Sequence, residues 1–162
     1  HRFMEYVIED MTLANSDAVA RLWHSGWIDG HEAIVPKALG NLRTLESFQT
    51  RAAAYVGITR VAMSNGALLG FVMVQADEIY QMYVGPHARG TGVAQALMHD
   101  GEARIKAAAH RLAWLSCAVG NERAARFYLK SGWNNERTET IAVETLDKPF
   151  DLEVWRFEKR LT

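Results

Sequence analysis

The spacing of apolar residues changes several times along the chain, and each change predicts a helix or a strand. From Val93 to Ala108, apolar or small residues recur every three or four positions, which predicts an amphipathic helix. The preceding run "EIYQMYV" at 78–84 is rich in aromatic and branched side chains, which is typical of a strand. Pro86 follows this run and is expected to end it. The local unit is therefore a strand, a glycine-containing loop and a helix.

The same criteria predict the remaining elements, and Asn65-Gly66 is a strong hairpin signal. Further strands are expected at 6–10, on both sides of Asn65-Gly66 within 57–75, at 111–119, at 137–145 and at 150–159, and further helices at 15–27, at 44–55 and from the cap Asn121 to Gly132. The segment 28–36 is expected to be irregular.

This order of elements predicts an α+β fold with a mixed, mostly antiparallel central sheet flanked by helices. The fourth and fifth strands are joined by a long helical crossover, so they are expected to be parallel. Ile79 and Met82 cannot share one face of a regular strand, which indicates a β-bulge between them.

The stretch "VGPHARGTGVAQALM" at 84–98 places glycines at the entrance of a helix. The first N–H groups of a helix lack intrahelical partners, and together with the positive end of the helix dipole they form an anion site. A nucleotide P-loop would need a Lys followed by Ser or Thr after the second glycine, and neither is present. A dinucleotide fingerprint needs a small residue where Gln95 stands. The alternatives are another phosphate-bearing ligand or a tight turn that caps the helix.

Two motifs in this part of the chain resemble those of one family. The pattern V-x-P-x-x-R-G-x-G-x-A-x-x-L beginning at Val84, and the later segment "NERAARFYLKSGW" at 121–133, are similar to the two coenzyme-binding segments of the GNAT superfamily of N-acetyltransferases. The resemblance is specific over 78–133 and loose elsewhere. It implies a GNAT-type fold in which strands four and five splay apart and acetyl-CoA, the implied cosubstrate, enters between them.

The resemblance also implies a set of coenzyme-binding residues, in which the loop amides hold the pyrophosphate. His87 stands where the family often has Gln or Arg, so the role of its side chain is open while that of its backbone is not. The implied residues are Met82, Tyr83, Val84, His87, Arg89, Gly90, Thr91, Gly92, Val93, Ala94, Asn121 and Tyr128.

Acetyl transfer to an amine requires positioning, a donor for the developing oxyanion, and the movement of protons. Strand N–H groups near 82–84 are candidates for the oxyanion donor. A lysine-like amine with a pKa of about 10.4 costs roughly 4.6 kcal/mol to present in its neutral form at pH 7. Glu78, which begins the same strand, is the candidate base, and an exposed strand-end carboxylate is the alternative. The resemblance gives Tyr128 the role of protonating the coenzyme thiolate, and a core aromatic residue is the alternative.

Other side chains with catalytic potential have simpler interpretations. His24 and His31 lie in the helix-to-loop segment that often lines the acceptor cleft in the family, but ordinary surface or core histidines are expected. Trp23 and Trp27 are expected in the core, with an aromatic rim on the acceptor site as the alternative. Cys117 has no neighbouring base in sequence, which disfavours an acetyl-cysteine intermediate. His, Cys and Asp show no metal-ligand spacing, so no metal is expected.

Length and composition give expectations about the number of domains, the partners and the cellular compartment. A chain of 162 residues fits a single GNAT-type domain spanning 1–162. The net charge of −1 gives no argument for nucleic acid or an anionic membrane as a partner. The first residues lack the apolar core of a signal peptide, and the single cysteine fits a reducing compartment, so a cytoplasmic protein is expected.

These observations favour an acyltransferase that moves an acetyl group from acetyl-CoA to a primary amine, on a small molecule or a peptide, by direct attack. The alternatives are an acyl-CoA-sensing module of the same fold and an enzyme that uses another acyl-CoA. A homodimer is a further expectation, with exposed Trp155 and Phe157 on the last strand as its contact. Four acidic residues are candidates for a cleft that takes a cationic amine: Glu32, Glu46, Asp77 and Glu78.

Overall fold

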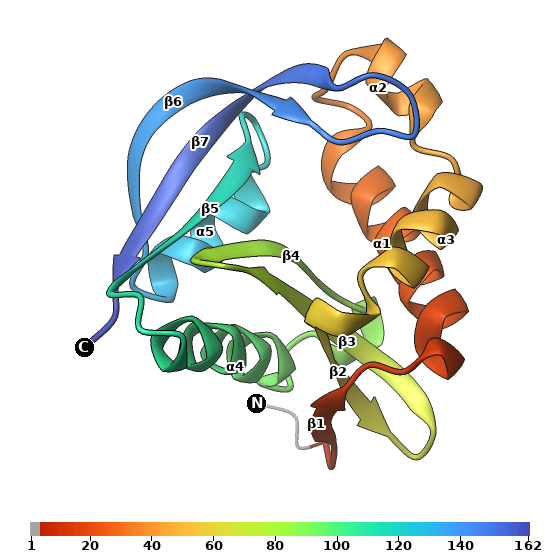
Figure 1. The fold of residues 1–162 in the computed structure, drawn as a ribbon, viewed down its shortest axis with the longest axis vertical. Coiled ribbons are helices and arrows are strands. Elements are labelled where there is room, and N and C mark those ends of the chain that lie inside the picture. The colour runs from red at the N-terminus through yellow and green to blue at the C-terminus, as the bar shows by residue number, and fades with distance from the viewer. Residues whose placement is uncertain (1–3) are drawn as a thin grey trace.

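A single seven-stranded sheet organises the computed structural model, which describes residues 4–162 (Figure 1). Every neighbouring pair is antiparallel except β4 and β5, which are parallel. In sheet order the strands are β1 (Val7–Asp10), β2 (Thr59–Ser64), β3 (Ala67–Gln75), β4 (Glu78–Val84), β5 (Leu112–Ala118), β7 (Phe150–Arg160) and β6 (Asn134–Val143). The predicted α+β class, the mixed sheet and the parallel pair are confirmed.

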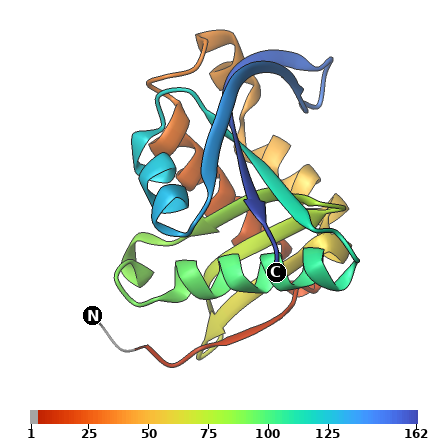
Figure 2. The ribbon, with the colours of Figure 1, turned by 90° about the vertical axis from the view of Figure 1, so that its left-hand side faces the viewer.

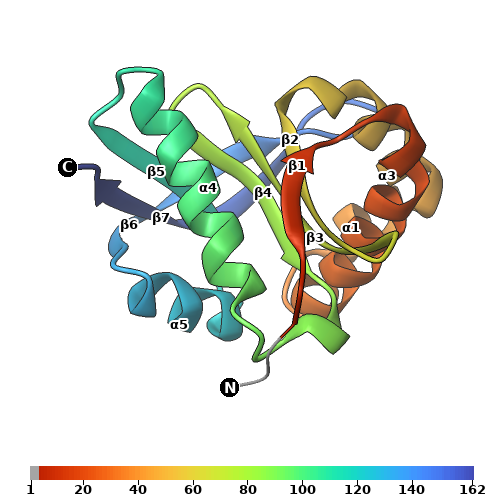
Figure 3. The same cartoon turned by 90° about the horizontal axis from the view of Figure 1, so that it is seen from below.

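Helices cover both faces of this sheet. One face carries α1 and α3, and the other carries α4, as the view from below shows (Figure 3). The helices are α1 (Ser16–His31), α2 (Lys37–Leu42), α3 (Leu45–Ala54), α4 (Val93–Ala107) and α5 (Glu122–Lys130), with short 3-10 turns at Leu13–Asn15, Val56–Ile58 and Pro86–Ala88. None of the helices within residues 4–162 combines the length and the apolar character needed to cross a membrane.

The region between the first two predicted helices differs from expectation. Helix α1 continues to His31 through the segment expected to be irregular, and α2 follows as an unpredicted helix. Gly30 lowers the helix propensity of the α1 extension, yet a side chain there would crowd the Asn121 amide, with 3.2 Å between an added Cβ and Nδ2. Helix α2 has only six residues, too few to show a helical period.

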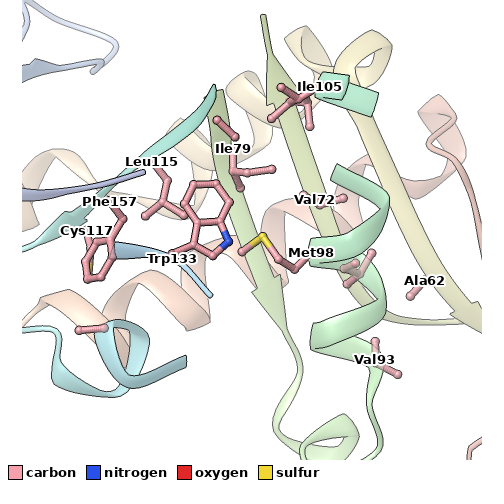
Figure 4. Packing of buried hydrophobic residues seen from close by; sticks show 14 of the residues in the cluster. Ala62, Val72, Ile79, Val93, Met98, Ile105, Leu115, Cys117, Trp133 and Phe157 are labelled. Atoms are coloured by element: carbon pink, nitrogen blue, oxygen red, sulfur yellow. The ribbon is translucent and has the colours of Figure 1, made fainter. Parts of the chain in front are cut away.

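The hydrophobic core forms two clusters, one on each face of the sheet. In the cluster under α4, Trp133 packs among Met98, Leu115 and Phe157 (Figure 4). The expectation that Phe157 is exposed is wrong, because its exposed fraction is 0% and Trp155 is half-buried. The reason is that β7 lies between β5 and β6, so its apolar face is covered by the core cluster.

Two irregularities of β4 open the sheet. Met73 pairs with Gln81 and Val74 pairs with Ile79, so Tyr80 is the extra residue of a bulge. This confirms the bulge predicted between Ile79 and Met82. Within residues 4–162, β4 and β5 share one registered pair, Glu78 with Trp114, and then diverge.

Candidate active site

A cavity of about 880 Å³ lies where β4 and β5 diverge. Its walls come from α1, α2, α3, β4, the start of α4, β5 and α5, and from the end of β6 and the start of β7. The hairpin between β6 and β7 reaches toward α2 at one end of the molecule, and α4 lies at the other (Figures 1 and 2). The cavity therefore has two chemically different ends, which we describe in turn.

The glycine loop forms the end near α4. Gly90 and Gly92 adopt positive φ angles of 75° and 86°, and Gly92 is the N-cap of α4. The first backbone bond of the helix runs from the Ala96 N–H to the Gly92 carbonyl, 3.0 Å. The N–H groups of Ala94 and Gln95 precede that bond, which leaves them as donors for an anion. The loop thus has the geometry of a phosphate cradle.

Some of the predicted loop residues line the cavity, and others lie outside it. Arg89 lines the cavity and lies 3.4 Å from the Asp29 carboxylate, which Arg123 also contacts at 3.3 Å. His87 is exposed and lies outside the cavity lining. Thr91 is buried, and its hydroxyl donates to the Ala88 carbonyl. Gly90, Gly92 and Ala94 line the cavity, whereas Val93 is buried in the core.

Strand β4 forms one wall, with Met82, Tyr83 and Val84 lining the cavity. The Tyr83 ring packs directly against Gly26 of α1, where an added Cβ would lie 2.4 Å from Cδ1. Only a glycine at this position lets α1 approach the ring so closely. Gly26 was not among the residues predicted for the site, because a single glycine within a helical pattern carries no signal of a cavity wall.

Tyr128 and Asn121 come together on the opposite wall, where both line the cavity. The Asn121 side chain accepts a bond from the Ala124 N–H at 3.4 Å, as expected of a cap. The Tyr128 ring lies 5.4 Å from that of Phe157. Burial raises the pKa of Tyr128, and the neighbouring Cys117 adds to the effect. The hydroxyl therefore keeps its proton at neutral pH.

Glu78 lies at the point where β4 and β5 separate, and its side chain lines the cavity. Burial raises the pKa of Glu78 to about 7, with a smaller contribution from the Asp77 charge, while Arg156 opposes the shift. Asp77 itself accepts a bond from Trp114 Nε1 at 2.9 Å, and the Arg156 guanidinium lies 4.4 Å from the centroid of the Trp114 ring. Glu78 is thus a carboxyl group that exchanges protons near neutral pH.

A charged network forms the end of the cavity near the β6–β7 hairpin. The Arg51 guanidinium donates to Glu144 at 3.0 Å and to the Tyr80 hydroxyl at 3.3 Å. The hydroxyls of Tyr55 and Tyr80 also donate to Glu144, at 2.7 and 2.9 Å. The Arg51 guanidinium lies 4.2 Å from the centroid of the Trp23 ring. Sequence reasoning missed this network because Arg51 and Glu144 are distant in the chain and neither belongs to a motif.

Arg43, which follows α2, lines the same end of the cavity. Its guanidinium lies 5.9 Å from the centroid of the Trp27 ring, and its Nε and Nη1 atoms are buried with no hydrogen-bond partner within the described part of the chain. His31 stacks on Trp27 with centroids 5.3 Å apart, and its Nδ1 donates to the Trp27 carbonyl at 3.1 Å. Burial lowers the pKa of His31, so the ring is neutral and Nε2 is unprotonated.

The acidic cleft expected for a cationic amine does not form. Glu32 and Glu46 are exposed and lie outside the cavity lining. Asp77 is held by Trp114, which leaves Glu78 as the one member of the set that lines the cavity. His24 packs against Phe48 instead of lining the cavity, with ring centroids 5.6 Å apart.

A glycine loop at a helix N-terminus, two diverging parallel strands and a large cavity between them together define an acetyltransferase of the GNAT type. The model of the acetyltransferase (GNAT) family matches residues 19–133. The chain belongs to this family.

Relatives and solved structures agree with this assignment. Proteins described as uncharacterized N-acetyltransferases from Mycobacterium bovis and Mycobacterium tuberculosis are 30% identical over 118 residues, which is 67% of this chain and 76% of theirs. A GCN5-related N-acetyltransferase from Rhodopseudomonas palustris has the same fold, with a TM-score of 0.73 and 19% identity over 99% of both chains. The PaiA N-acetyltransferase of Thermoplasma acidophilum, solved with coenzyme A, gives a TM-score of 0.73 at 14% identity over 98% of this chain and 100% of that one.

Proposed function

We propose that this acetyltransferase moves an acetyl group from acetyl-CoA to a primary amine by direct attack. The observation that carries the proposal is the placement of Glu78 and Tyr128 on one cavity, whose far end is a phosphate cradle. The residues fit the coenzyme because an added Cβ at Gly90 would meet no atom within 4 Å, Gly90 and Gly92 both have positive φ, and the free N–H groups at the start of α4 are donors for a pyrophosphate. YncA from Salmonella typhimurium, solved with its cofactor acetyl-CoA, has the same fold at 14% identity, with a TM-score of 0.72 over 98% of this chain and 95% of that one, and its ligand is consistent with this fit.

Glu78 removes the proton of the incoming amine in this mechanism. The amine nitrogen then attacks the thioester carbonyl carbon, and the carbon–sulfur bond breaks as the new carbon–nitrogen bond forms. Backbone N–H groups of β4 on the side facing the gap, near 82–84, stabilise the oxyanion. Tyr128 donates its proton to the departing thiolate and regains one when the new amide nitrogen loses its second proton, and its raised pKa keeps the phenol protonated between turnovers.

The cysteine of the cavity supports direct attack over a covalent intermediate. Burial raises the pKa of Cys117 to about 12, so its thiolate is scarce at neutral pH. A group that is so seldom ionised is a poor nucleophile, whereas the amine has Glu78 as a base.

The test is release of free coenzyme A thiol from acetyl-CoA in the presence of amines that include polyamines, amino acids, aminoglycosides and peptide N-termini. Turnover of at least one amine is expected, with loss in Glu78→Gln and Tyr128→Phe and retention in Tyr6→Phe, whose ring packs against the core away from the cavity lining. Binding of acetyl-CoA without turnover of any amine would favour an acyl-CoA-sensing role instead.

A further inference from the structure

Arg43 is the most unusual charged residue of the cavity. Its exposed fraction is 7%, and two of its three guanidinium nitrogens are buried without a hydrogen-bond partner within residues 4–162. A buried charge without a partner destabilises a fold, so such groups are normally paired with an opposite charge or with hydrogen-bond acceptors. Within residues 4–162, no side chain or backbone group accepts a hydrogen bond from these two nitrogens.

Arg43 lies near further donors, and neither His31 nor Tyr83, the nearby groups that could accept, takes a hydrogen bond from its Nε or Nη1 within residues 4–162. Burial, and after it the nearby Arg51 charge, lower the pKa of Arg43 to about 10, although Tyr80, Tyr83 and Glu144 act in the opposite direction. Glu144, the carboxylate of this region, is already occupied by Arg51, Tyr55 and Tyr80. The indole N–H of Trp23, which also lines the cavity, is a further buried donor without a partner within the described chain. This end of the cavity therefore has an excess of hydrogen-bond donors and positive charge.

The coenzyme phosphates are poorly placed to supply the missing anion. Their cradle is at the start of α4, whereas Arg43 follows α2, and these two helices lie at opposite ends of the molecule (Figures 1 and 2). The missing anion therefore belongs to the second substrate, whose amine must reach Glu78 between these two ends.

We propose that the acceptor is a small amine that also carries a carboxylate, as a free amino acid does, and that Arg43 binds this carboxylate. The inference rests on the proposed function, since it names the substrate class of the same site. The planar guanidinium presents two parallel N–H groups that match the two oxygens of a carboxylate. Trp27, Leu39 and Leu152 line this part of the cavity and favour an apolar side chain on the acceptor.

The experiment compares each acceptor with its own uncharged counterpart. Acetylation of L-leucine, L-methionine and L-phenylalanine is measured beside that of their amides and of the amines left after loss of the carboxyl group. The 1-aminoalkylphosphonate analogues separate a carboxylate requirement from a general requirement for an oxyanion. Each series is run with wild type, Arg43→Met, Arg43→Lys and the control Arg21→Met, which removes an exposed arginine of α1 outside the cavity.

The wild type is expected to show a kcat/KM at least tenfold higher for an amino acid than for its amide or decarboxylated amine, because bonds to charged groups contribute about 1.5–3 kcal/mol. Arg43→Met should reduce this ratio to near one, mainly by raising KM for the amino acid, and any change in kcat/KM for the neutral amines should be much smaller than this. Arg43→Lys, which keeps the charge but loses the fork, should fall between the two. Arg21→Met should keep the wild-type ratio. A wild-type preference for neutral amines, or an unchanged ratio in Arg43→Met and Arg43→Lys, would overturn the assignment.

A binding measurement separates failure of this inference from failure of the proposed function. Quenching of tryptophan fluorescence by the N-acetyl amino acids, against their amides, reports the carboxylate pocket whether or not turnover occurs, because Trp23 and Trp27 line it. If no amine is acetylated, carboxylate-dependent binding that Arg43→Met abolishes would still support the pocket. Absence of that dependence in the wild type would refute it.

Discussion

The substitution Glu78→Gln tests the chemistry most directly, because it keeps the shape of the side chain and removes the proton-accepting charge. With a pKa of about 7, the wild-type carboxyl is ionised in about a tenth of molecules at pH 6 and about nine tenths at pH 8. We therefore expect wild-type kcat/KM to rise by close to tenfold between these values. General-base catalysis contributes roughly 10²–10⁴-fold, so the Glu78→Gln deficit should be about a hundredfold or more near pH 7.

The dependence of this deficit on pH separates a base from a binding role. As the pH approaches the pKa of the acceptor amine, hydroxide supplies the neutral amine, and the kcat deficit should narrow. The assay is kcat and KM for wild type and Glu78→Gln from about pH 6 to 10 with one acceptor. A kcat ratio that does not change with pH would refute the role of base, and a raised KM alone would indicate acceptor binding.

Two companion measurements check the origin of the shifted pKa. Asp77 raises the pKa of Glu78, so Asp77→Asn should move the acidic limb of the pH profile of activity to lower pH without removing activity.

The folded state also binds the Glu78 proton more tightly than the unfolded chain does. The contribution of Glu78 to the free energy of unfolding therefore falls as pH rises from about 4.5 through 7. The free energy of unfolding of Glu78→Gln should therefore exceed that of the wild type by about 1 kcal/mol at pH 8, allowing for solvent screening, and should equal it at pH 4. Urea unfolding at both pH values measures the difference.

Three further predictions concern the cavity walls. Tyr128→Phe should lower turnover about ten- to a thousandfold with little change in acetyl-CoA affinity. If the variant turns over as fast as the wild type, Tyr128 has only a packing role. Acetyl-CoA at a hundredfold excess over its dissociation constant should stabilise the fold by about 2.7 kcal/mol, or roughly 5–10 °C in Tm, and Gly92→Val should remove the shift. Gly66→Val, which puts the same strain at φ 79° in the β2–β3 turn, should keep that shift and so controls for backbone strain. Gly26→Val should cost about 1–3 kcal/mol in unfolding free energy, measured by denaturant, because its side chain would overlap the Tyr83 ring.

Periodicity and local motifs were sufficient for most of the fold. The hairpin at Asn65-Gly66, the glycine loop before α4 and the cap at Asn121 each depend on a few adjacent residues, and the structure has all three. Helix α2 was missed because two helical turns carry too few apolar positions to show a period.

The glycine-loop end of the cavity was predictable for the same reason, and the end near the β6–β7 hairpin was not. Gly90 and Gly92 belong to one contiguous motif, so their neighbourhood follows from the sequence. The partners of Arg51 lie 29 and 93 residues away, and only tertiary packing brings them together. The buried position of Arg43 contradicts the usual preference of arginine for the surface, so composition and pattern could not indicate it.

The divergence of β4 and β5 gives this sheet two internal edges. Beyond the pair Glu78 with Trp114, each strand presents unpaired backbone groups to the gap, although both lie in the middle of the sheet order. Unpaired strand edges are templates for the extended segments of other chains, and proteins usually cover them. A ligand in the gap covers these two strand edges. The protein without coenzyme is therefore expected to self-associate more readily on storage than the coenzyme-bound protein. Hydrogen exchange at 81–84 and 115–118 should slow on coenzyme binding for the same reason.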